Sequence, residues 1–379
     1  MKSFLPFTRP SIDEASIAAV SEVFRSGQLA SGPKVREFEA ALCAYHGGER
    51  HFRVMTSATA GLEMALEVAG VRAGDEVIVP AMSFAASANV VVRLKATPVF
   101  VDVDLLARNI DVELARKAVT RRTRAIMPVH FSGLAADLDG IHGLAKEYGL
   151  RVVEDAAHAI GTRHRGRLVG SSGDLVVFSF HPNKNMTTIE GGAISVASAE
   201  EAARIEELRF HGIRKDEDGG VDVMFAGAKS NLSDVAAQVG IDQLRRLDGF
   251  NRRRRELAEL YFRELEGFSP VVLPARGDEG HSWHMFTLLI DFNAQRMTRV
   301  QFQKVMHERG IGIGIHYPSI PGFTCYRIMG YRPGDYPNAA RIGRETVTLP
   351  LFPAMEDADV SRVCRAMRDV LREVPARTG

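Results

Sequence analysis

The sequence is poor in the features that mark several classes of protein. Its 379 residues include only three cysteines, Cys43, Cys325 and Cys364, which lie far apart and are odd in number. This usage argues against a disulfide framework and against a C-x-x-C metal site, and it fits a reducing compartment. Lysine plus arginine (48) balances aspartate plus glutamate (47), so no global field attracts nucleic acid or an anionic membrane. We therefore expect neither a nucleic-acid nor a membrane partner.

No long apolar run is present either. The longest weakly polar stretch, Val77–Val92, is interrupted by Pro80 and by polar residues, and it is too short to span a bilayer. The first residues contain acidic side chains and prolines where a signal peptide needs an apolar core. The 45% hydrophobic and 25% charged residues are the ordinary globular balance. These observations predict a soluble, cytoplasmic protein.

Several well-known motifs are missing. The chain has no G-x-G-x-x-G after a strand, no G-x-x-x-x-G-K-[ST], no G-x-S-x-G and no H-E-x-x-H. His281 and His284 are three residues apart and could share a helix face, but no third ligand lies nearby, so we expect no metal site. Four arginines, Arg252–Arg255, could form a nucleic-acid patch; pairing with Glu256 and Glu259 at i,i+4 favours a solvated helix face instead.

Short apolar runs rich in β-branched residues alternate with amphipathic stretches through the first two thirds of the chain. This alternation predicts an α/β fold with a mostly parallel sheet covered on both faces. Ligands of such sheets bind at the carboxyl ends of the strands, so the residues after each run are candidates for a site. The seven expected strands are His51–Ser57, Asp75–Pro80, Thr97–Asp104, Thr123–Phe131, Arg151–Ala157, Asp174–Phe180 and Gly191–Ala197.

The character of the sequence changes near Asp248. A charged helical stretch leads to Pro270, and an apolar run, a Gly/Ile alternation and a closing helix follow. We expect a large domain over residues 1–247 and a smaller α+β C-terminal domain over residues 248–379. The N-terminal segment of the large domain could pack on the small one.

Three groups of residues follow different expected strands. The first is Thr56–Leu66, where a strand is expected to end at Ser57 and small residues and hydroxyls open a helix near Thr59. Free backbone N–H groups and the helix dipole favour an anion there. Serine and threonine also cap many helices for purely structural reasons, so this signal alone is weak.

The second group is Asp155 and His158, at the end of an apolar strand. A carboxylate at this position is costly to bury unless a cation meets it, and Asp155 could keep a ring nitrogen protonated. A helix N-cap is the alternative interpretation.

The third group contains Ser179, His181 and Lys184, which follow another apolar strand and precede Gly191 and Gly192. Most lysines are solvated surface charges. Lys184, however, lies in a turn of small and polar residues directly after a buried strand, where an imine-forming lysine can present its amine to a carbonyl. An anion site, a pyridinium partner and such a lysine together are what pyridoxal 5′-phosphate (PLP) requires.

With these residues in place, the chain resembles the DegT/DnrJ/EryC1/StrS family of nucleotide-sugar aminotransferases, which are fold-type I PLP enzymes. The most specific strings are FSFHPNKN at Phe178–Asn185, EDAAH at Glu154–His158 and EGG at Glu190–Gly192. Further matches cover nearly the whole chain, from Phe4–Ile12 through Gly74–Phe84, Met127–Ile141, Leu208–Arg214, Asn231–Gly240 and His316–Pro318 to Leu349–Pro353.

The resemblance implies a role for each matched position. Lys184 resembles the imine-forming lysine and proton shuttle, Asp155 the partner of the pyridine nitrogen, and His158 the residue near the ring hydroxyl. Implied cofactor contacts are Phe84, stacked on the ring, Ala58, Thr59 and Ser179 on the phosphate, and Asn231, reaching the phosphate across a dimer interface. Implied substrate contacts are Arg9, His211, His316 and Tyr317.

The resemblance also implies a reaction and an assembly. The expected partners are a nucleotide-sugar substrate, L-glutamate as amino donor and a second copy of the chain in a homodimer with shared active sites. Within the family, the chain is most similar to members that aminate C4 of a nucleotide-linked 4-keto sugar, as in the synthesis of UDP-4-amino-4-deoxy-L-arabinose. Lysine at position 184 favours transamination over the dehydratase branch, which has histidine there. Amination at C3 and a non-catalytic regulatory homologue remain open alternatives.

Three departures from the family pattern concern the sugar. Gln28 stands where relatives usually carry an aromatic residue, the turn around Lys184 reads HPNKNMTT, and GAKS precedes Asn231. All three lie where the sugar or the partner subunit would approach. Nucleotide, sugar and pathway are therefore open at this point.

Overall fold

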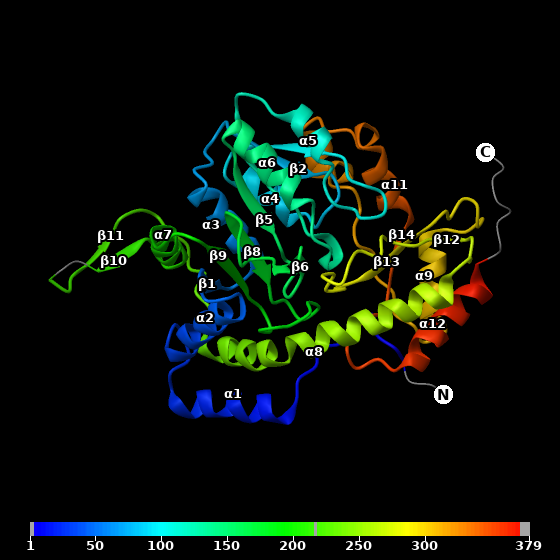
Figure 1. Ribbon diagram of the computed structural model, residues 1–379, viewed down its shortest axis with the longest axis horizontal. Coiled ribbons are helices and arrows are strands. Elements are labelled where there is room, and N and C mark those ends of the chain that lie inside the picture. Colours follow the sequence, from blue (N-terminus) through cyan, green and yellow to red (C-terminus); the bar gives the residue numbers. More distant parts are fainter. Residues whose placement is uncertain (1–3, 216–217, 372–379) are drawn as a thin grey trace.

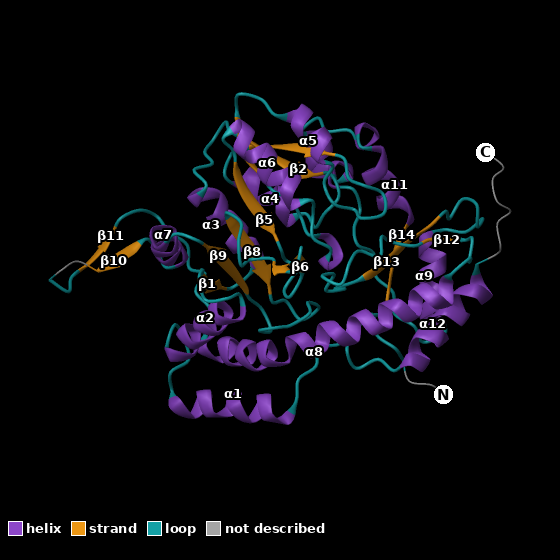
Figure 2. Ribbon diagram, in the orientation of Figure 1, coloured by secondary structure: helices purple, strands orange, loops and turns teal. Residues whose placement is uncertain are grey.

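The computed structural model describes residues 4–215 and 218–371. A large sheet flanked by helices forms one part of the molecule, and a small sheet with its own helices forms the other (Figure 1). Figure 2 shows the long helix α8 (Asp234–Leu265) running beneath both parts. Among the described residues, no helix is long and apolar enough to cross a membrane.

The large sheet has seven strands in the order β1-β9-β8-β5-β4-β2-β3. All neighbouring pairs are parallel except the two that involve β9, so six strands run one way and β9 runs against them. The expected α/β class with a mostly parallel seven-stranded sheet is confirmed. The strands are β1 (His51–Met55), β2 (Glu76–Pro80), β3 (Thr97–Val101), β4 (Thr123–Ile126), β5 (Arg151–Asp155), β8 (Leu175–Ser179) and β9 (Gly192–Val196).

Helices cover both faces of this sheet because alternate strand residues point to opposite sides and both sets are apolar. Val77, Val153 and Val177 pack in a cluster with one set of helices, whereas Val152 and Val176 belong to clusters on the opposite side. The first set is α3 (Ala58–Val68), α4 (Ala86–Arg93) and α7 (Ala199–Arg209); the second is α2 (Pro33–Tyr45), α5 (Val112–Ala118), α6 (Leu138–Tyr148) and the first half of α8.

The small sheet is antiparallel and has the order β12-β13-β14. Its helices enclose a separate apolar cluster, which also takes in Leu5 from the N-terminal segment, next to Ile311. The elements around this cluster are β12 (Val271–Val272), β13 (Phe286–Ile290) and β14 (Thr346–Leu349), with α9 (Arg299–Glu308) and α12 (Asp357–Val370). The 3₁₀ turn Ile320–Gly322, α10 (Thr324–Ile328) and α11 (Pro337–Glu345) add their apolar residues to a cluster of the large sheet, and the 3₁₀ turn Pro333–Asp335 precedes α11.

Helix α8 bears on two expectations. Its 32 residues run without a break across the expected boundary between residues 247 and 248, so the division into two domains stays a prediction. The arginine run does not form the expected i,i+4 pairs: Arg253 binds Glu256 and Asp357, and Arg254 is buried with its guanidinium on backbone carbonyls. The interpretation of the run as a solvated face is therefore wrong for Arg254.

Three further elements lie outside the two sheets. Helix α1 (Glu14–Ser26) packs on α8, and the short hairpin β6 (Arg163–His164) and β7 (Arg167–Leu168) follows β5. The hairpin β10 (Ile213–Lys215) and β11 (Val221–Val223) projects from the body beyond α7 (Figure 1).

Candidate active site

A cavity of about 330 Å³ opens where the strands of the large sheet end, against the segment that carries His316 and Tyr317 from the small-sheet part. This is the edge at which open α/β sheets bind ligands. Nine of the twelve predicted site residues line it: Ala58, Thr59, Phe84, Asp155, His158, Ser179, Lys184, His316 and Tyr317. The residues that form the cavity come from more than 250 positions of sequence, and the fold brings them together.

One end of the cavity is the N-terminus of α3. Ser57 is the N-cap, and its Oγ accepts the backbone N–H of Ala60 at 3.1 Å, whereas the first N–H groups of the helix have no helical partner. Gly192 lies against this turn so closely that a Cβ there would be 2.5 Å from the Ala58 nitrogen. Glycine is therefore required at this position, and the exposed N–H groups with the Ser57 and Thr59 hydroxyls suit a phosphate.

Asp155 ends β5 and is almost fully buried. Its carboxylate accepts hydrogen bonds from Ser87 Oγ at 2.8 Å and from the Ala157 backbone nitrogen at 3.1 Å. Burial nevertheless raises the pKa of Asp155, against the effect of these bonds and of the nearby Lys184 charge. A cation in the cavity would keep this carboxylate ionised. Ser87, which lies 68 positions away on α4, was not predicted as a partner of Asp155.

The neighbouring residue Glu154 faces the other side of the sheet. It is buried between His130, whose Nε2 lies 3.1 Å from Oε2, and His142, whose Nε2 lies 3.4 Å from Oε1. His130 Nδ1 accepts the Ala136 N–H, so its Nε2 carries the proton toward Glu154. The hydrogen bond with Glu154 raises the pKa of His142, and both histidines lower the pKa of Glu154 against its burial.

The contact between His142 and Glu154 predicts that the stability of the protein depends on pH. The pKa of His142 is higher in the folded than in the unfolded protein. Its contact with Glu154 therefore contributes fully to folding stability below about pH 6.5, the ordinary histidine value, and this contribution is lost as the pH rises through the folded-state pKa. We expect the difference in unfolding free energy between wild type and His142→Asn to be larger at pH 5.5 than at pH 8.5. Urea denaturation at the two pH values measures it, and an equal difference at both would contradict the assignment.

Lys184 lies in the turn after β8, where its backbone nitrogen donates to the His181 carbonyl at 2.9 Å. Its side chain lines the cavity. Burial lowers the pKa of Lys184 to about 8, although the Asp155 charge acts in the opposite direction. A substantial fraction of the amine is then neutral near pH 7 to 8, as an amine that attacks a carbonyl must be.

His158 forms the floor of the cavity and is neutral, because burial and the Lys184 charge lower its pKa well below the ordinary value. Its Nδ1 accepts the Ser132 N–H at 3.3 Å, so Nε2 carries the proton and points to the Tyr317 hydroxyl at 3.3 Å. Tyr317 stacks over His158 with 6.0 Å between ring centroids and lies 5.7 Å from the Phe84 ring. Phe84 is 56% exposed at the rim, which leaves its face free for a planar ligand.

A buried amide network behind Lys184 was not predicted. Asn185 Nδ2 donates to Asn251 Oδ1 at 2.7 Å and to the Ser282 carbonyl at 2.9 Å, and its Oδ1 faces His284 Nδ1 at 3.2 Å. The His284 ring lies 4.6 Å from that of His158. His284 therefore joins the turn of Lys184 to His158. His284 is buried just before β13. His281 and His284 do not share a helix face, because the chain is not helical at these residues.

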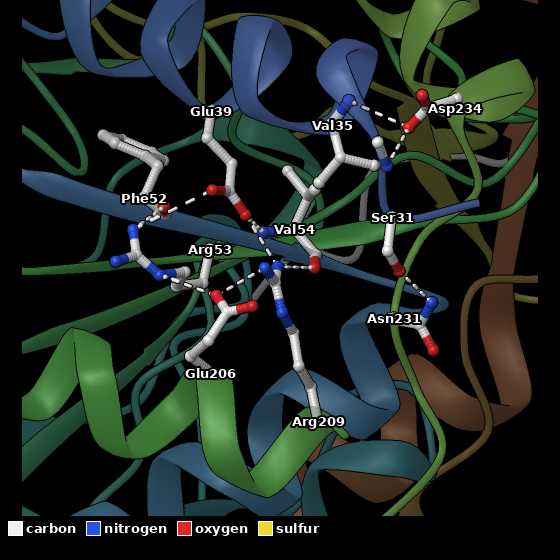
Figure 3. A network of polar contacts seen from close by, with 11 residues as sticks. Ser31, Val35, Glu39, Phe52, Arg53, Val54, Glu206, Arg209, Asn231 and Asp234 are labelled. Carbon is white, nitrogen blue, oxygen red and sulfur yellow. Dashed lines mark hydrogen bonds and ion pairs between the residues drawn. The ribbon is translucent and has the colours of Figure 1, made fainter. Parts of the chain in front are cut away.

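Three predicted residues do not line the cavity. Arg9 is exposed in the N-terminal segment, and His211, at φ 59°, begins the connection to the projecting hairpin. Asn231 lies on the surface beside β1, where its Nδ2 contacts Ser31 Oγ and its Oδ1 contacts Lys229 Nζ (Figure 3). Their assigned roles stay predictions.

The position of the Asn231 segment is fixed by backbone hydrogen bonds to α7, which is itself held by a partly buried ion network around Arg209 (Figure 3). Arg209 on α7 pairs with Glu39 of α2 at 2.6 Å and with Glu206, and its backbone carbonyl accepts the Ser230 N–H at 2.8 Å. The Ser230 carbonyl in turn accepts the N–H of Thr56, which precedes the helix cap Ser57. The strand next to the anion-binding turn and the surface segment that carries Asn231 are therefore one connected unit.

The residues of the cavity fit PLP. A turn with free N–H groups and a glycine cradle suits the phosphate, buried Asp155 suits the pyridine nitrogen, and Lys184 with its lowered pKa suits the carbonyl. Among the described residues, no group of three or more His, Cys, Asp or Glu side chains is arranged to hold a metal ion.

Comparison with known proteins supports this assignment. Residues 10–368 match the model of the DegT/DnrJ/EryC1/StrS aminotransferase family. The spore coat polysaccharide biosynthesis protein SpsC of Bacillus subtilis is 38% identical over 97% of both chains.

Two solved structures have the same fold over nearly the whole chain. Spr1654 of Streptococcus pneumoniae, provisionally assigned as a sugar aminotransferase and solved in its PLP form, superposes with a TM-score of 0.89 at 30% identity, covering 97% of this chain and 98% of its own. DesI, solved in the presence of its TDP-sugar product, superposes with a TM-score of 0.87 at 32% identity, covering 97% and 93%.

Proposed function

Because the chain belongs to the DegT/DnrJ/EryC1/StrS aminotransferase family, we propose that it transfers the amino group of L-glutamate to a nucleotide-diphosphate-linked 4-keto sugar. The enzyme is a PLP-dependent sugar aminotransferase. The observation that carries the proposal is the position of Lys184 in one cavity with Asp155 and the N-terminus of α3. The TDP-sugar product in whose presence DesI was solved supports a nucleotide sugar as the acceptor.

The described residues divide the chemistry among them. PLP, when bound, supplies an electron sink that allows an amino group to pass from a donor to an acceptor. The helix terminus at Ser57–Thr59 would hold the phosphate, and Asp155 would hold a proton on the ring nitrogen. Lys184 Nζ, with its lowered pKa, would take a proton from the α-carbon of the amino donor. It would later deliver a proton to the sugar carbon that receives the amino group. His158, held as one tautomer by the Ser132 N–H, would lie beside the ring hydroxyl with its Nε2–H toward the Tyr317 hydroxyl.

Transamination is favoured over dehydration by the amine at position 184. A dehydratase of this family has histidine there, which cannot form the same bond to the cofactor. The regulatory alternative loses support because Lys184, Asp155 and His158 are all present and gathered at one cavity.

The regiochemistry is tested with the product itself. We expect the cofactor-loaded enzyme, given L-glutamate and a UDP-linked or dTDP-linked 4-keto-6-deoxy sugar, to form 2-oxoglutarate and a sugar aminated at C4. Proton and nitrogen NMR of the isolated product locates the amine. If the enzyme forms an amino sugar only from a 3-keto sugar, the position of amination is C3 rather than C4, and the assignment as an aminotransferase still holds.

A shared active site gives a separate prediction. If Asn231 reaches the cofactor phosphate of a partner subunit, Lys184→Ala and Asn231→Ala damage sites that are complemented in a mixed dimer. We expect each homodimer to be strongly impaired and an equal mixture, after subunit exchange, to recover about a quarter of wild-type activity, because half the dimers carry one intact site. No recovery despite exchange would place Asn231 in its own subunit's site or outside the site.

A further inference from the structure

Arg108 is a buried cation next to the cavity whose charge has no acidic partner. It is 2% exposed, and among the residues that the structure describes no carboxylate forms an ion pair with it. It follows β3 in a turn closed by its own N–H on the Asp104 carbonyl at 2.9 Å, with φ at 61°. Burial lowers the pKa of Arg108 to about 9, so the guanidinium stays charged at neutral pH. Such a group is costly to bury, which calls for an explanation in terms of what it contacts.

The guanidinium of Arg108 contacts three residues from different parts of the chain that surround the His316–Tyr317 segment. One guanidinium nitrogen donates to Thr346 Oγ1 at 2.9 Å and approaches the His316 carbonyl at 3.4 Å. Thr346 Oγ1 donates to the same carbonyl at 3.0 Å. The guanidinium also lies 5.7 Å from the centre of the Phe131 ring, which packs edge-on against Tyr317.

The His316 carbonyl belongs to the peptide unit that joins His316 to Tyr317. Two donors aimed at this oxygen fix the plane of that peptide, and the plane sets where both side chains point. His316 Nδ1 is then held by Thr348 Oγ1 at 2.8 Å, and the Tyr317 hydroxyl lies 3.3 Å from His158 Nε2. A continuous set of contacts thus leads from Arg108 through Thr346 and the His316–Tyr317 peptide to His158.

We propose that Arg108 is a positioning residue of the active site, which holds the His316–Tyr317 peptide so that the Tyr317 hydroxyl stays on His158. The inference rests on the proposed function, in which His158 lies beside the ring hydroxyl of PLP. Arg108 itself does not line the cavity, so it acts only through these neighbours. The titratable groups that face the cavity are Asp155, His158, His181, Lys184, Glu190, His316 and Tyr317.

The two kinds of role for Arg108 predict different results for Arg108→Met. Replacing a buried, unpaired charge by an apolar side chain of similar length is often neutral or stabilising. The His316 carbonyl keeps the Thr346 donor, so no buried acceptor is left without a partner. We therefore expect the thermal midpoint of the apo protein to be unchanged or higher, whereas the active site is disturbed.

The effect of each variant on the active site is measured from the absorbance of bound PLP, without any substrate. The visible absorbance of the PLP-loaded protein is titrated against pH for wild type, Arg108→Met, Tyr317→Phe and the double variant. We expect each single change to shift the midpoint in the same direction by about half to one pH unit, as loss of one hydrogen bond would. The double variant should shift no further than Tyr317→Phe alone, because both act through one contact.

Thr346→Val is the matched control, since it removes the linking hydroxyl at nearly constant shape and leaves every charge in place. We expect it to reproduce the direction of the Arg108→Met shift. A midpoint unchanged by Arg108→Met, or shifts that add fully in the double variant, would overturn the proposal. If the wild-type protein itself forms no visible band with PLP, the proposed function fails and this inference falls with it.

Discussion

Replacing Lys184 by alanine is expected to abolish transamination. Among the described residues that line the cavity, the Lys184 amine is the only group suited to bond the cofactor carbonyl, and it is also the proposed carrier of the proton between donor and acceptor. Loss of both functions should lower kcat by about four orders of magnitude or more. The rate of 2-oxoglutarate formation from L-glutamate, with saturating cofactor and sugar, measures this.

Two further variants show whether the loss of activity comes from the Lys184 amine itself, rather than from the loss of a positive charge or of any lysine. Lys184→Arg keeps a cation near Asp155 but cannot form the bond, so it should be as inactive as the alanine variant. Lys146→Ala, on the exposed face of α6, should retain wild-type activity. Appreciable turnover by Lys184→Ala would contradict the assignment of this residue.

Replacing Asp155 by asparagine is expected to lower kcat by about two orders of magnitude or more. The buried carboxylate is proposed to hold a proton on the ring nitrogen, and a neutral amide cannot stabilise that positive charge. Cofactor affinity should fall much less, because the phosphate is held at the N-terminus of α3. Steady-state kinetics and equilibrium dialysis with PLP give the two quantities separately.

Ser87→Ala provides a graded comparison with Asp155→Asn. It removes one hydrogen bond of 2.8 Å from the carboxylate and leaves the charge, so about a twofold to tenfold loss of kcat is expected. Its effect in the Asp155→Asn background should be small, because the two act through the same carboxylate. An Asp155→Asn enzyme with near-native kcat would refute the proposed role.

Much of the fold was predictable because its signals are local. Each of the seven strands lies within one of the short runs rich in apolar, β-branched residues from which it was predicted, as is typical of strands in a sheet covered on both faces. The same rule located Asp155, Ser179 and Lys184, since polar residues directly after buried strands meet at one edge of the sheet. The glycine at position 192 was matched by its motif, and the structure supplies the reason, the close approach of Ala58.

The supporting residues could not be predicted, because their partners are distant in sequence. Ser87 meets Asp155, Asn185 meets Asn251 and His284, and Arg108 meets Thr346 across 238 positions. The local pattern gave a wrong prediction for Arg254. A run of four arginines is typical of a solvated helix face, but the Arg254 side chain is buried and donates to the carbonyls of His284 and Leu351. Only the packing of α8 against both sheets reveals this.

The visible spectrum of the purified, PLP-loaded protein, recorded before and after addition of L-glutamate, tests the central claim most directly. We expect a yellow protein whose visible band gives way to the shorter-wavelength band of the pyridoxamine form, with one equivalent of 2-oxoglutarate released per site. A visible band that L-glutamate leaves unchanged would contradict glutamate as the donor. A protein that forms no visible band with PLP would contradict the assignment of Lys184 and, with it, the enzyme proposed here.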